Sequence, residues 1–470
     1  MDRLAHISNA SNPKRYLTNI RDASQKIWFR LDLSWRWAIG GVLAVRLLYG
    51  LWSLVILFIS PLAVQNLILN GEKVVSVFDL HSSQGHLYER TVNGQTLTFR
   101  PAGQDELIDV QTGTKWNVSS GQATTGKLAG RYLSPATTQV EEVFPYHGVK
   151  PEPADWLAVW QRFDTTWFQK IAEDGYAATD GSTAFFPLYP LLIRLVALLV
   201  GNSLVAALLI STFALLAALF LFHKTAIEYA DVESANLAFI YLLIFPAAFF
   251  LLAGYTESTF LALALASFLF ARRRRWLVAA IFGWLAALTR GTGILLVIPL
   301  AYMWWNQGTK RRLQDAIFAL LTPSGAATYL LISNLGTLKS YQTAWHASLV
   351  FPWEHFTELG RLIANHLVTP TDILNLIVAL LFGCICIFVW LKITPELGLY
   401  AASMFLIPLF GLNPGQPFVS MSRYVLVIFP AFILLGKWGK NAWVNRLILY
   451  PSFLAALFFS AQFWMWGWVG

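Results

Sequence analysis

Long apolar segments recur along the 470-residue chain and restrict its fold more than any other feature. A segment of about 20 apolar residues crosses the hydrocarbon core of a bilayer as a helix. The chain is 56% hydrophobic and 13% charged, whereas soluble domains carry roughly 25% charged residues. We therefore expect an all-α polytopic membrane protein with about 11 transmembrane helices. The expected spans are 37–63, 203–222, 235–253, 256–271, 276–289, 293–306, 313–334, 369–392, 396–412, 423–436 and 444–466.

Basic clusters predict which loops face the cytoplasm, because Lys and Arg are enriched on that side of membrane proteins. These clusters are the N-terminal arm 1–36, Arg272–Arg275, Lys310–Arg312 and the pair Lys437 and Lys440. The net charge of +8 is then explained by cytoplasmic loops that face anionic lipid. We expect contact with the lipid bilayer and no binding of nucleic acid.

The apolar segment 186–200 decides whether this assignment is consistent. With about 11 spans, the basic clusters fall on one side only if this segment enters and leaves at the outer face. We therefore expect a re-entrant or membrane-lying helix that is broken by Pro187 and Pro190. The alternative is one span more or one span fewer elsewhere in the chain.

Residues 66–150 are polar and rich in Gly, Thr, Ser and Val, unlike the rest of the chain. Short alternating patches are typical of strands, and Asn93-Gly94 between two of them indicates a hairpin. We expect a small β-rich insert on the outer face with a limited core of its own. The expected organisation is a cytoplasmic arm at 1–36, a first transmembrane helix at 37–63, the insert at 66–150, a first-loop catalytic segment with membrane-lying helices at 151–200, and a transmembrane helical core at 203–470.

Asp164 is the first candidate for chemistry. On a helix it shares one face with Trp160, Trp167, Phe168 and Ile171. Partial desolvation on such a face raises the pKa of a carboxyl group and suits a general base. The alternative is a helix N-cap, because two threonines follow Asp164. Glu173 and Asp174 are interpreted as polar residues that decorate the helix end.

A second carboxylate, Glu257, lies in the sequence Tyr255-Thr256-Glu257-Ser258 between two apolar segments, on the expected outer side. So short a connection keeps Glu257 near the membrane, where a charge is costly and usually functional. There it would meet Asp164 or bind a sugar hydroxyl. The alternative is that Thr256 or Ser258 caps the following helix.

Two arginines are expected on the same membrane face. Arg290 precedes Gly291-Thr292-Gly293, so its planar guanidinium and the glycine N–H groups suit a phosphate. The alternative for Arg290 is pairing with a lipid headgroup. Arg423, after the polar segment 413–417, would supply a second cation. His346 lies in an aromatic-rich outer loop, where a structural role is the alternative to a catalytic one.

Together these motifs resemble the GPI mannosyltransferase II (PIG-V) family and its prokaryotic relatives. The resemblance is carried by Phe163-Asp164, Ile171–Tyr176, Ala184–Pro190, Phe245-Pro246, Phe249-Phe250, Tyr255–Ser258, Leu288–Arg290 and Arg423-Tyr424. It covers roughly residues 155–310 well and the rest loosely, and the Phe-Phe-Pro and Tyr-Thr-Glu strings in this order make it specific. The chain departs from the family at Thr165, where a small residue is commoner, and in the length of its insert.

The resemblance implies a GT-C glycosyltransferase, a polytopic enzyme that uses a polyprenyl-phosphate-linked sugar and an acidic residue of the first outer loop as catalytic base. By this resemblance Asp164 is the base, and Arg290 and Arg423 bind the donor phosphate. The other candidates for substrate or donor binding are Glu257, Tyr255, Tyr189 and His346. Such a transfer needs a base on the incoming hydroxyl and positive charge at the leaving phosphate, and a single displacement inverts the anomeric centre.

We therefore expect a hexosyltransferase, a mannosyltransferase in particular, that acts on a glycan, lipid or protein acceptor. It is expected at the outer face of a prokaryotic plasma membrane, or in the endoplasmic reticulum lumen of a eukaryote. We expect no cofactor and no metal, although Asp164 and Glu257 together would suit a cation. A transporter or flippase of lipid-linked sugars is the alternative, but it predicts an inverted repeat and charges spread through the bilayer. A membrane assembly factor, in which the insert binds a partner, would leave Asp164 and both arginines without a role.

Overall fold

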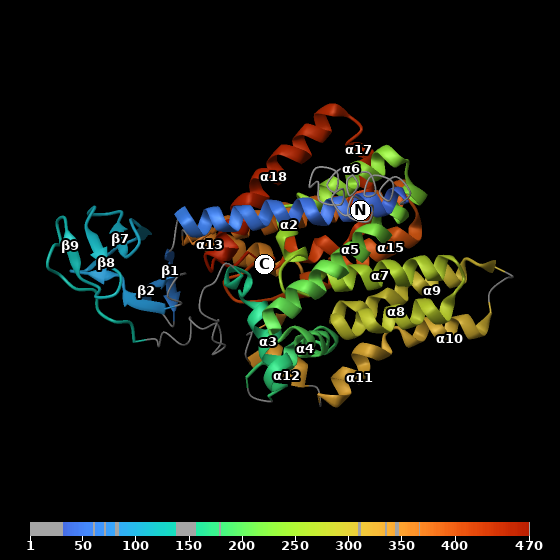
Figure 1. Cartoon of the computed structure of the whole chain (residues 1–470), viewed down its shortest axis with the longest axis horizontal. Helices are drawn as coiled ribbons and strands as arrows, with labels where there is room; N and C mark the ends of the chain where they lie inside the picture. The colour runs from blue at the N-terminus through green and yellow to red at the C-terminus, as the bar shows by residue number, and fades with distance from the viewer. Residues whose placement is uncertain are drawn as a thin grey trace, which may run out of the picture.

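The computed structural model describes residues 32–59, 62–69, 72–79, 84–137, 157–177, 180–308, 312–333, 336–343, 347–365 and 367–469. Most of them form helices, and nine short strands form a separate lobe at the left end of the molecule in Figure 1. The longest helices, α2 (Leu33–Ile59) and α5 (Ser203–Tyr229), have 27 residues each. In Figure 1, α2 runs from the helical part to the lobe of strands.

The remaining helices follow one another along the chain after the lobe. They are α3 (Asp164–Asp174), α4 (Leu188–Val200), α6 (Val232–Leu243), α7 (Glu257–Arg272), α8 (Trp276–Thr289), α9 (Val297–Trp305), α10 (Leu313–Leu321), α11 (Ser324–Ile332), α12 (Gly336–Thr343), α13 (Glu354–Ala364), α14 (Pro370–Lys392), α15 (Pro395–Leu406), α16 (Met421–Tyr424), α17 (Phe429–Trp438) and α18 (Ala442–Trp464). Their main core is apolar and rich in phenylalanine, with Phe249, Phe250, Phe429 and Phe432 fully buried.

The lobe confirms the prediction of a small β-rich insert. Its strands are β1 (Leu62–Leu69), β2 (Glu72–Asp79), β3 (Gln84–Glu89), β4 (Thr91–Val92), β5 (Gln95–Thr96), β6 (Phe99–Pro101), β7 (Glu106–Asp109), β8 (Lys115–Asn117) and β9 (Ala123–Thr125). They pair antiparallel in the orders β1-β2-β3, β4-β5 and β6-β7-β8-β9. A core of its own surrounds the buried Trp116. Residues 138–150 of the predicted insert lie outside the described residues.

The predicted hairpin at Asn93-Gly94 is also confirmed. The two residues connect β4 and β5, and Thr91 is paired with Thr96 across the turn. Their φ angles are 50° and 79°, as a two-residue turn between strands requires, and Asn and Gly are the residues that adopt such angles at least cost. Local sequence therefore determines this turn.

The apolar helices confirm a multi-pass membrane protein. Within the described part of the chain, four helices are long and apolar enough to cross a membrane, namely α2, α5, α14 and α18. The number rises to six if two bent pairs each form one span, α10 with α11 at 41° and residues 421–427 with α17 at 84°. Other expected spans are shorter helices such as α8, which has 14 residues. The count of about 11 spans stays a prediction.

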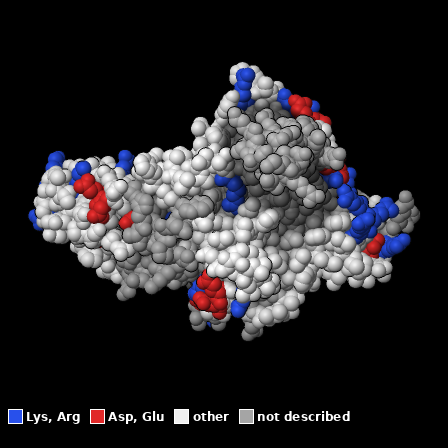
Figure 2. All heavy atoms as spheres, viewed as in Figure 1, with Lys and Arg blue, Asp and Glu red and all other residues white. Residues whose placement is uncertain are grey.

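The surface is that of a protein that faces lipid. On the face shown in Figure 2, charged side chains gather mainly toward the edges, and broad uncharged areas lie between them. Large apolar side chains are exposed on several helices; Leu43 and Leu47 of α2 are 65% and 64% exposed, and Leu198 and Leu199 of α4 are 79% and 86% exposed. Exposure on this scale is expected where acyl chains replace water.

The segment 186–200 differs in one respect from the prediction. Pro187 and Pro190 do not break the helix, because α4 begins at Leu188 and continues to Val200. Pro187 precedes the first helical residue and Pro190 lies in the first turn, where the missing N–H has no helical partner to lose. A membrane-lying position for α4 stays a prediction.

Candidate functional site

Asp164 is the first residue of α3, and the backbone before it is strained. Phe163, in the N-cap position, has φ 50° and ψ −118°, a backbone conformation that residues other than glycine rarely adopt. The N-cap position of α3 is occupied by Phe163, and the Asp164 carboxylate pairs with Arg423, so the N-cap interpretation of Asp164 is wrong. Trp160 lies in a separate 3₁₀ turn, Ala158–Trp160, so the predicted helix face begins at Asp164.

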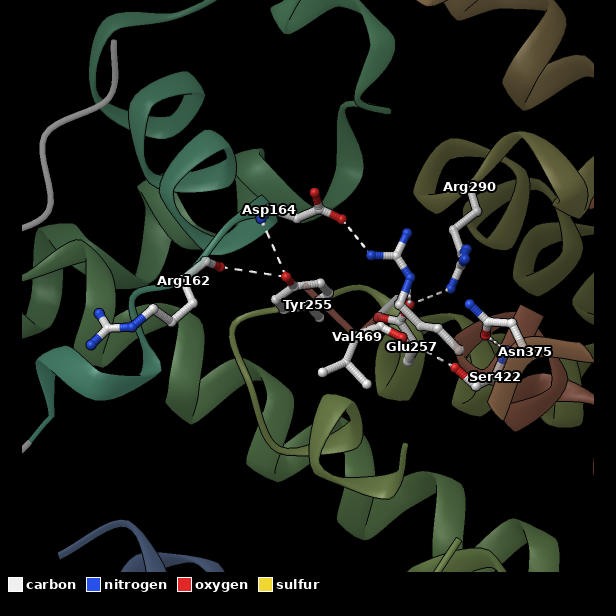
Figure 3. Close-up of polar contacts among 9 residues, drawn as sticks. Arg162, Asp164, Tyr255, Glu257, Arg290, Asn375, Ser422 and Val469 are labelled. Carbon is white, nitrogen blue, oxygen red and sulfur yellow. Dashed lines mark hydrogen bonds and ion pairs between the residues drawn. The ribbon is translucent and has the colours of Figure 1, made fainter. Parts of the chain in front are cut away.

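Two carboxylates and two guanidinium groups alternate in a buried chain of ion pairs, which we call the ion cluster (Figure 3). Asp164 Oδ2 lies 2.6 Å from Arg423 Nη1. Glu257 Oε1 lies 3.2 Å from Arg423 Nε and 2.8 Å from Arg290 Nη1. The four side chains are between 1% and 12% exposed. The cluster is electrically neutral, which is how a low-dielectric site tolerates four charges.

Helix ends place these charges. Asp164 and Glu257 are the first residues of α3 and α7, where a helix dipole favours negative charge. Arg290 directly follows the last residue of α8, where the dipole favours a cation. Arg423 lies on α16, beside the 84° bend that precedes α17. Irregular backbone of this kind is tolerated at membrane depth where it is buried in protein or lines a cavity.

Neither Thr256 nor Ser258 caps α7, and Arg290 has a partner within the protein. Thr256 is the N-cap residue of α7 but makes no side-chain capping bond. Ser258 Oγ instead donates to the carbonyl of Leu251. Arg290 has a carboxylate partner within the protein, where a lipid headgroup was the alternative. The predicted meeting of Glu257 and Asp164 occurs through Arg423, which contacts both.

Aromatic rings surround the guanidinium groups. Tyr255 accepts a hydrogen bond from the N–H of Asp164 at 3.3 Å and donates to the carbonyl of Arg162 at 3.4 Å. Its ring centroid lies 5.4 Å from Cζ of Arg423. The Tyr424 ring lies 5.2 Å from Cζ of Arg290. These cation–π contacts stabilise the cations in a site with little water.

The surroundings of Asp164 determine its protonation. Burial raises the pKa of the Asp164 carboxyl above its ordinary value, and the Glu257 carboxylate acts in the same direction. The attraction of Arg423 and Arg290 opposes this change without cancelling it. Asp164 is therefore a stronger base than an exposed carboxylate. The described residues contain no group of three or more His, Cys, Asp and Glu side chains that could hold a metal ion.

Two predicted site residues lie elsewhere. Tyr189 donates to the carbonyl of Ala207 at 3.1 Å and shares a 2.7 Å hydrogen bond with Ser211. Ser211 in turn donates to the carbonyl of Tyr255 at 3.4 Å. Tyr189 therefore supports the site through Ser211 and the backbone of Tyr255, and it does not enter the ion cluster. His346 lies outside the described residues.

Residues that were not predicted to belong to the site also contact it. Arg162 is buried and donates to the carbonyls of Trp464 at 2.9 Å and Ala158 at 2.7 Å. Trp466 and Trp468 contact Phe163, the residue before Asp164. The sequence signal for the two tryptophans is their alternate spacing with Trp464 at the end of the last apolar segment, which is equally typical of an aromatic belt at the membrane surface.

Comparison with known families bears on this site. Residues 152–308 match the sequence model of the family described as Mannosyltransferase (PIG-V). The chain resembles PIG-V mannosyltransferases. The matched segment contains Asp164, Glu257 and Arg290, and the remaining member of the ion cluster, Arg423, lies outside it. The predicted PIG-V resemblance is confirmed over this segment, and with the apolar helices it supports an integral membrane glycosyltransferase.

One solved structure with similarity to the chain is the apo form of the Archaeoglobus fulgidus oligosaccharyltransferase. The sequence identity is 13% and the TM-score is 0.37. The match covers 68% of this chain and 53% of the other, so the PIG-V-like chain corresponds to about half the length of that protein. No curated protein matches the chain.

Proposed function

We propose that the chain transfers a hexose, mannose in particular, from a polyprenyl-phosphate donor to an acceptor hydroxyl at the outer face of the membrane. The observation that carries this proposal is the buried ion cluster, in which Asp164, a carboxylate with a raised pKa, pairs with Arg423, and Glu257 links Arg423 to Arg290. Three of these four residues lie in the PIG-V-like segment. A base and a cationic phosphate site are the two elements that this transfer requires.

Asp164 acts as the general base in this proposal. Arg423 holds Oδ2 at 2.6 Å, and Oδ1 has no hydrogen-bond partner among the described residues. Oδ1 accepts the proton of the acceptor hydroxyl while the oxygen of that hydroxyl forms a bond to the anomeric carbon. The bond from the anomeric carbon to the phosphate oxygen breaks, and the electron pair leaves with the polyprenyl phosphate. Attack opposite the leaving group inverts the anomeric centre.

Arg423 and Arg290 receive the phosphate. The leaving phosphate gains one negative charge as its bond to the sugar breaks, so guanidinium groups beside it stabilise the transition state more than the bound donor. Both guanidinium groups are pre-oriented by Glu257, at 3.2 Å from Arg423 Nε and 2.8 Å from Arg290 Nη1. Pre-orientation lowers the cost of arranging the charges during the reaction.

Glu257 has a second role in the proposal. Its Oε2 is buried and has no hydrogen-bond partner in the described part of the chain. An unpaired buried carboxylate oxygen is costly, and a hydroxyl of the bound sugar would satisfy it. Glu257 thus orients both arginines with one oxygen and binds the sugar with the other. The acceptor is a glycan, a lipid or a protein.

The test compares wild type with Asp164→Asn in detergent, using a radiolabelled polyprenyl-phosphate mannose and measuring release of polyprenyl phosphate. Loss of a general base lowers the rate by about a hundredfold or more, and we expect that loss in the variant. The matched control is Asp174→Asn, the same change at the exposed end of the same helix, which should keep wild-type turnover.

Three outcomes would contradict parts of the proposal. Equal turnover in wild type and Asp164→Asn would remove Asp164 as the base and move attention to Glu257. Turnover with a glucose or galactose donor but not with mannose would change the sugar. Movement of intact labelled donor across liposome membranes without release of polyprenyl phosphate would favour a transporter of lipid-linked sugars.

A further inference from the structure

The segment Trp464–Val469, which we call the tryptophan segment, packs against the backbone that carries Asp164. The Phe163 ring lies with its centroid 5.4 Å from the Trp466 ring and 4.9 Å from the Trp468 ring, both edge to face. Phe163 immediately precedes Asp164, so these two rings restrict the backbone from which the carboxylate projects.

The same segment also holds Arg162. The Arg162 guanidinium lies 4.7 Å from the centroid of the Trp466 ring and donates from Nε to the carbonyl of Trp464 at 2.9 Å. The carbonyl of Arg162 accepts from Tyr255, which in turn accepts from the N–H of Asp164. The side chain and the backbone of Arg162 therefore tie the tryptophan segment to the base.

On its other side the tryptophan segment contacts the helix that carries Arg423. The Trp468 ring lies 5.7 Å from Cζ of Arg423. Ser422, next to Arg423, donates from Oγ to the carbonyl of Val469 at 3.4 Å, as Figure 3 shows. The Trp468 carbonyl accepts from Thr371 Oγ1 at 3.0 Å. One short segment thus reaches both members of the Asp164–Arg423 pair.

Backbone strain gathers in the segments that meet here. Among the described residues, six other than glycine have positive φ, and four of them surround this pair. These four are Phe163 at 50°, Phe418 at 54°, Ser420 at 60° and Trp466 at 58°. Phe163 precedes the base, Phe418 and Ser420 precede α16, and Trp466 lies in the tryptophan segment. Such conformations persist only where the surrounding contacts hold them, and they are found most often at functional sites.

We propose that Trp466 and Trp468 are positioning residues of the transferase site, which hold Asp164 and Arg423 at the separation that the reaction uses. The inference rests on the proposed function of Asp164 as base. Trp466 acts on the base through Phe163 and Arg162, and Trp468 covers Arg423 and excludes water from the pair. Neither ring needs to contact the substrate.

Replacing Trp468 tests this positioning. In Trp468→Leu the cover over Arg423 is lost, and we expect kcat to fall between about tenfold and a hundredfold, as small misplacements of reacting groups do, with little change in KM for the donor. Trp468→Phe keeps a ring at this position and should recover most of the activity. The control is Trp443→Leu, the same change at a residue of α18 that is 76% exposed; wild-type kcat in Trp468→Leu would overturn the proposal.

The pH profile separates positioning from a general loss of structure. Within the described part of the chain, the charged and titratable groups that face Asp164 are Arg423 of α16, Glu257 of α7, Arg290 after α8 and Tyr255 before α7. Water admitted by Trp468→Leu weakens the desolvation that raises the pKa of Asp164, so the acid limb of kcat should move to lower pH. A loss of folded enzyme would lower kcat equally at every pH, and that result would count against positioning.

A double-mutant cycle in thermal stability tests the inference without an activity assay. Apparent melting temperatures are measured at one heating rate in detergent for wild type, Trp468→Leu, Asp164→Asn and the double variant. If Trp468 acts on the Asp164–Arg423 pair, the melting temperature of the double variant falls by less than the sum of the decreases in the two single variants. Additive decreases would overturn positioning. A wild-type protein without transferase activity would contradict the proposed function. The double-mutant cycle would still show whether Trp468 acts on the Asp164–Arg423 pair.

Discussion

Two ion pairs of this molecule each join a cationic side chain to a carboxylate, one pair at the surface and the other buried. In the β-rich insert, Lys115 and Glu106 meet at 2.9 Å with 43% and 37% of their side chains exposed. In the ion cluster, Arg423 and Asp164 meet at 2.6 Å with 11% and 12% exposed. The first pair loses little hydration and contributes little, whereas the second has lost most of its water and depends on its partners. A short distance between opposite charges is therefore not enough to select a candidate site; burial of the pair and further charged partners distinguish the ion cluster from the surface pair.

We expect the largest difference between the two regions in the free energy of unfolding, when Glu257→Gln is compared with a matched change in the insert. Glu257→Gln leaves two buried arginines with one carboxylate, and breaking a buried pair costs about 3–5 kcal/mol. The matched control is Glu106→Gln in the insert, where loss of an exposed pair costs about 1 kcal/mol or less. Thermal or denaturant unfolding of the detergent-solubilised proteins measures both. Similar losses in the two variants would show that the ion cluster is hydrated and does not differ from the surface pair.

The next effect is a pH dependence that the exposed pair should not share. The proposed transfer needs an ionised Asp164, and burial raises the pKa of its carboxyl. As the pH falls through this raised pKa the base becomes protonated, so kcat/KM should fall about tenfold for each pH unit below it. We expect the acid limb to lie above the ordinary carboxyl pKa of about 4.

This prediction is checked with initial rates between about pH 4 and pH 8. Asp174→Asn should give the wild-type profile, since Asp174 is exposed at the far end of α3. A limb at the ordinary carboxyl pKa would place Asp164 in contact with bulk water in the working enzyme. A profile without an acid limb would exclude a carboxylate base altogether.

The sequence predicted features that depend on neighbouring residues. The apolar segments predicted a helical membrane protein, and Asn93-Gly94 predicted a hairpin, because each signal lies within a few residues of the structure it specifies. The helix faces were predicted less well. Trp160 was assigned to the helix of Asp164, but the strained Phe163 begins that helix and leaves Trp160 in a turn of its own.

The pairing within the site could be predicted only in part. Asp164 and Arg423 are 259 residues apart in sequence, and no local pattern states that they touch. Their shared membrane face suggested convergence, yet no local signal indicated that Arg423, on the short helix before the bend, would bridge two carboxylates. The tryptophan segment was missed for the same reason, because alternate tryptophans after an apolar helix equally indicate a membrane interface.

The smallest effect concerns the insert, where local sequence rather than long-range packing determines the structure. Gly94 has φ 79° in the hairpin turn, and a Cβ added there would meet no atom within 4 Å. Gly94→Ala should therefore cost only the conformational strain of a left-handed residue, about 1 kcal/mol. Hydrogen exchange of peptides that cover β4 and β5, measured on the full chain, should show faster exchange there and no change near Asp164.

The matched control for this change is Gly103→Ala in the same insert. Gly103 has no left-handed φ angle, and an added Cβ would come no closer than 3.7 Å to Glu106, so exchange should stay at the wild-type rate. If Gly94→Ala also accelerated exchange around Asp164 and lowered transferase activity, the insert would be coupled to the ion cluster. Gln65 of β1 and Phe78 of β2 contact Trp466, and they would be the route of that coupling through the tryptophan segment.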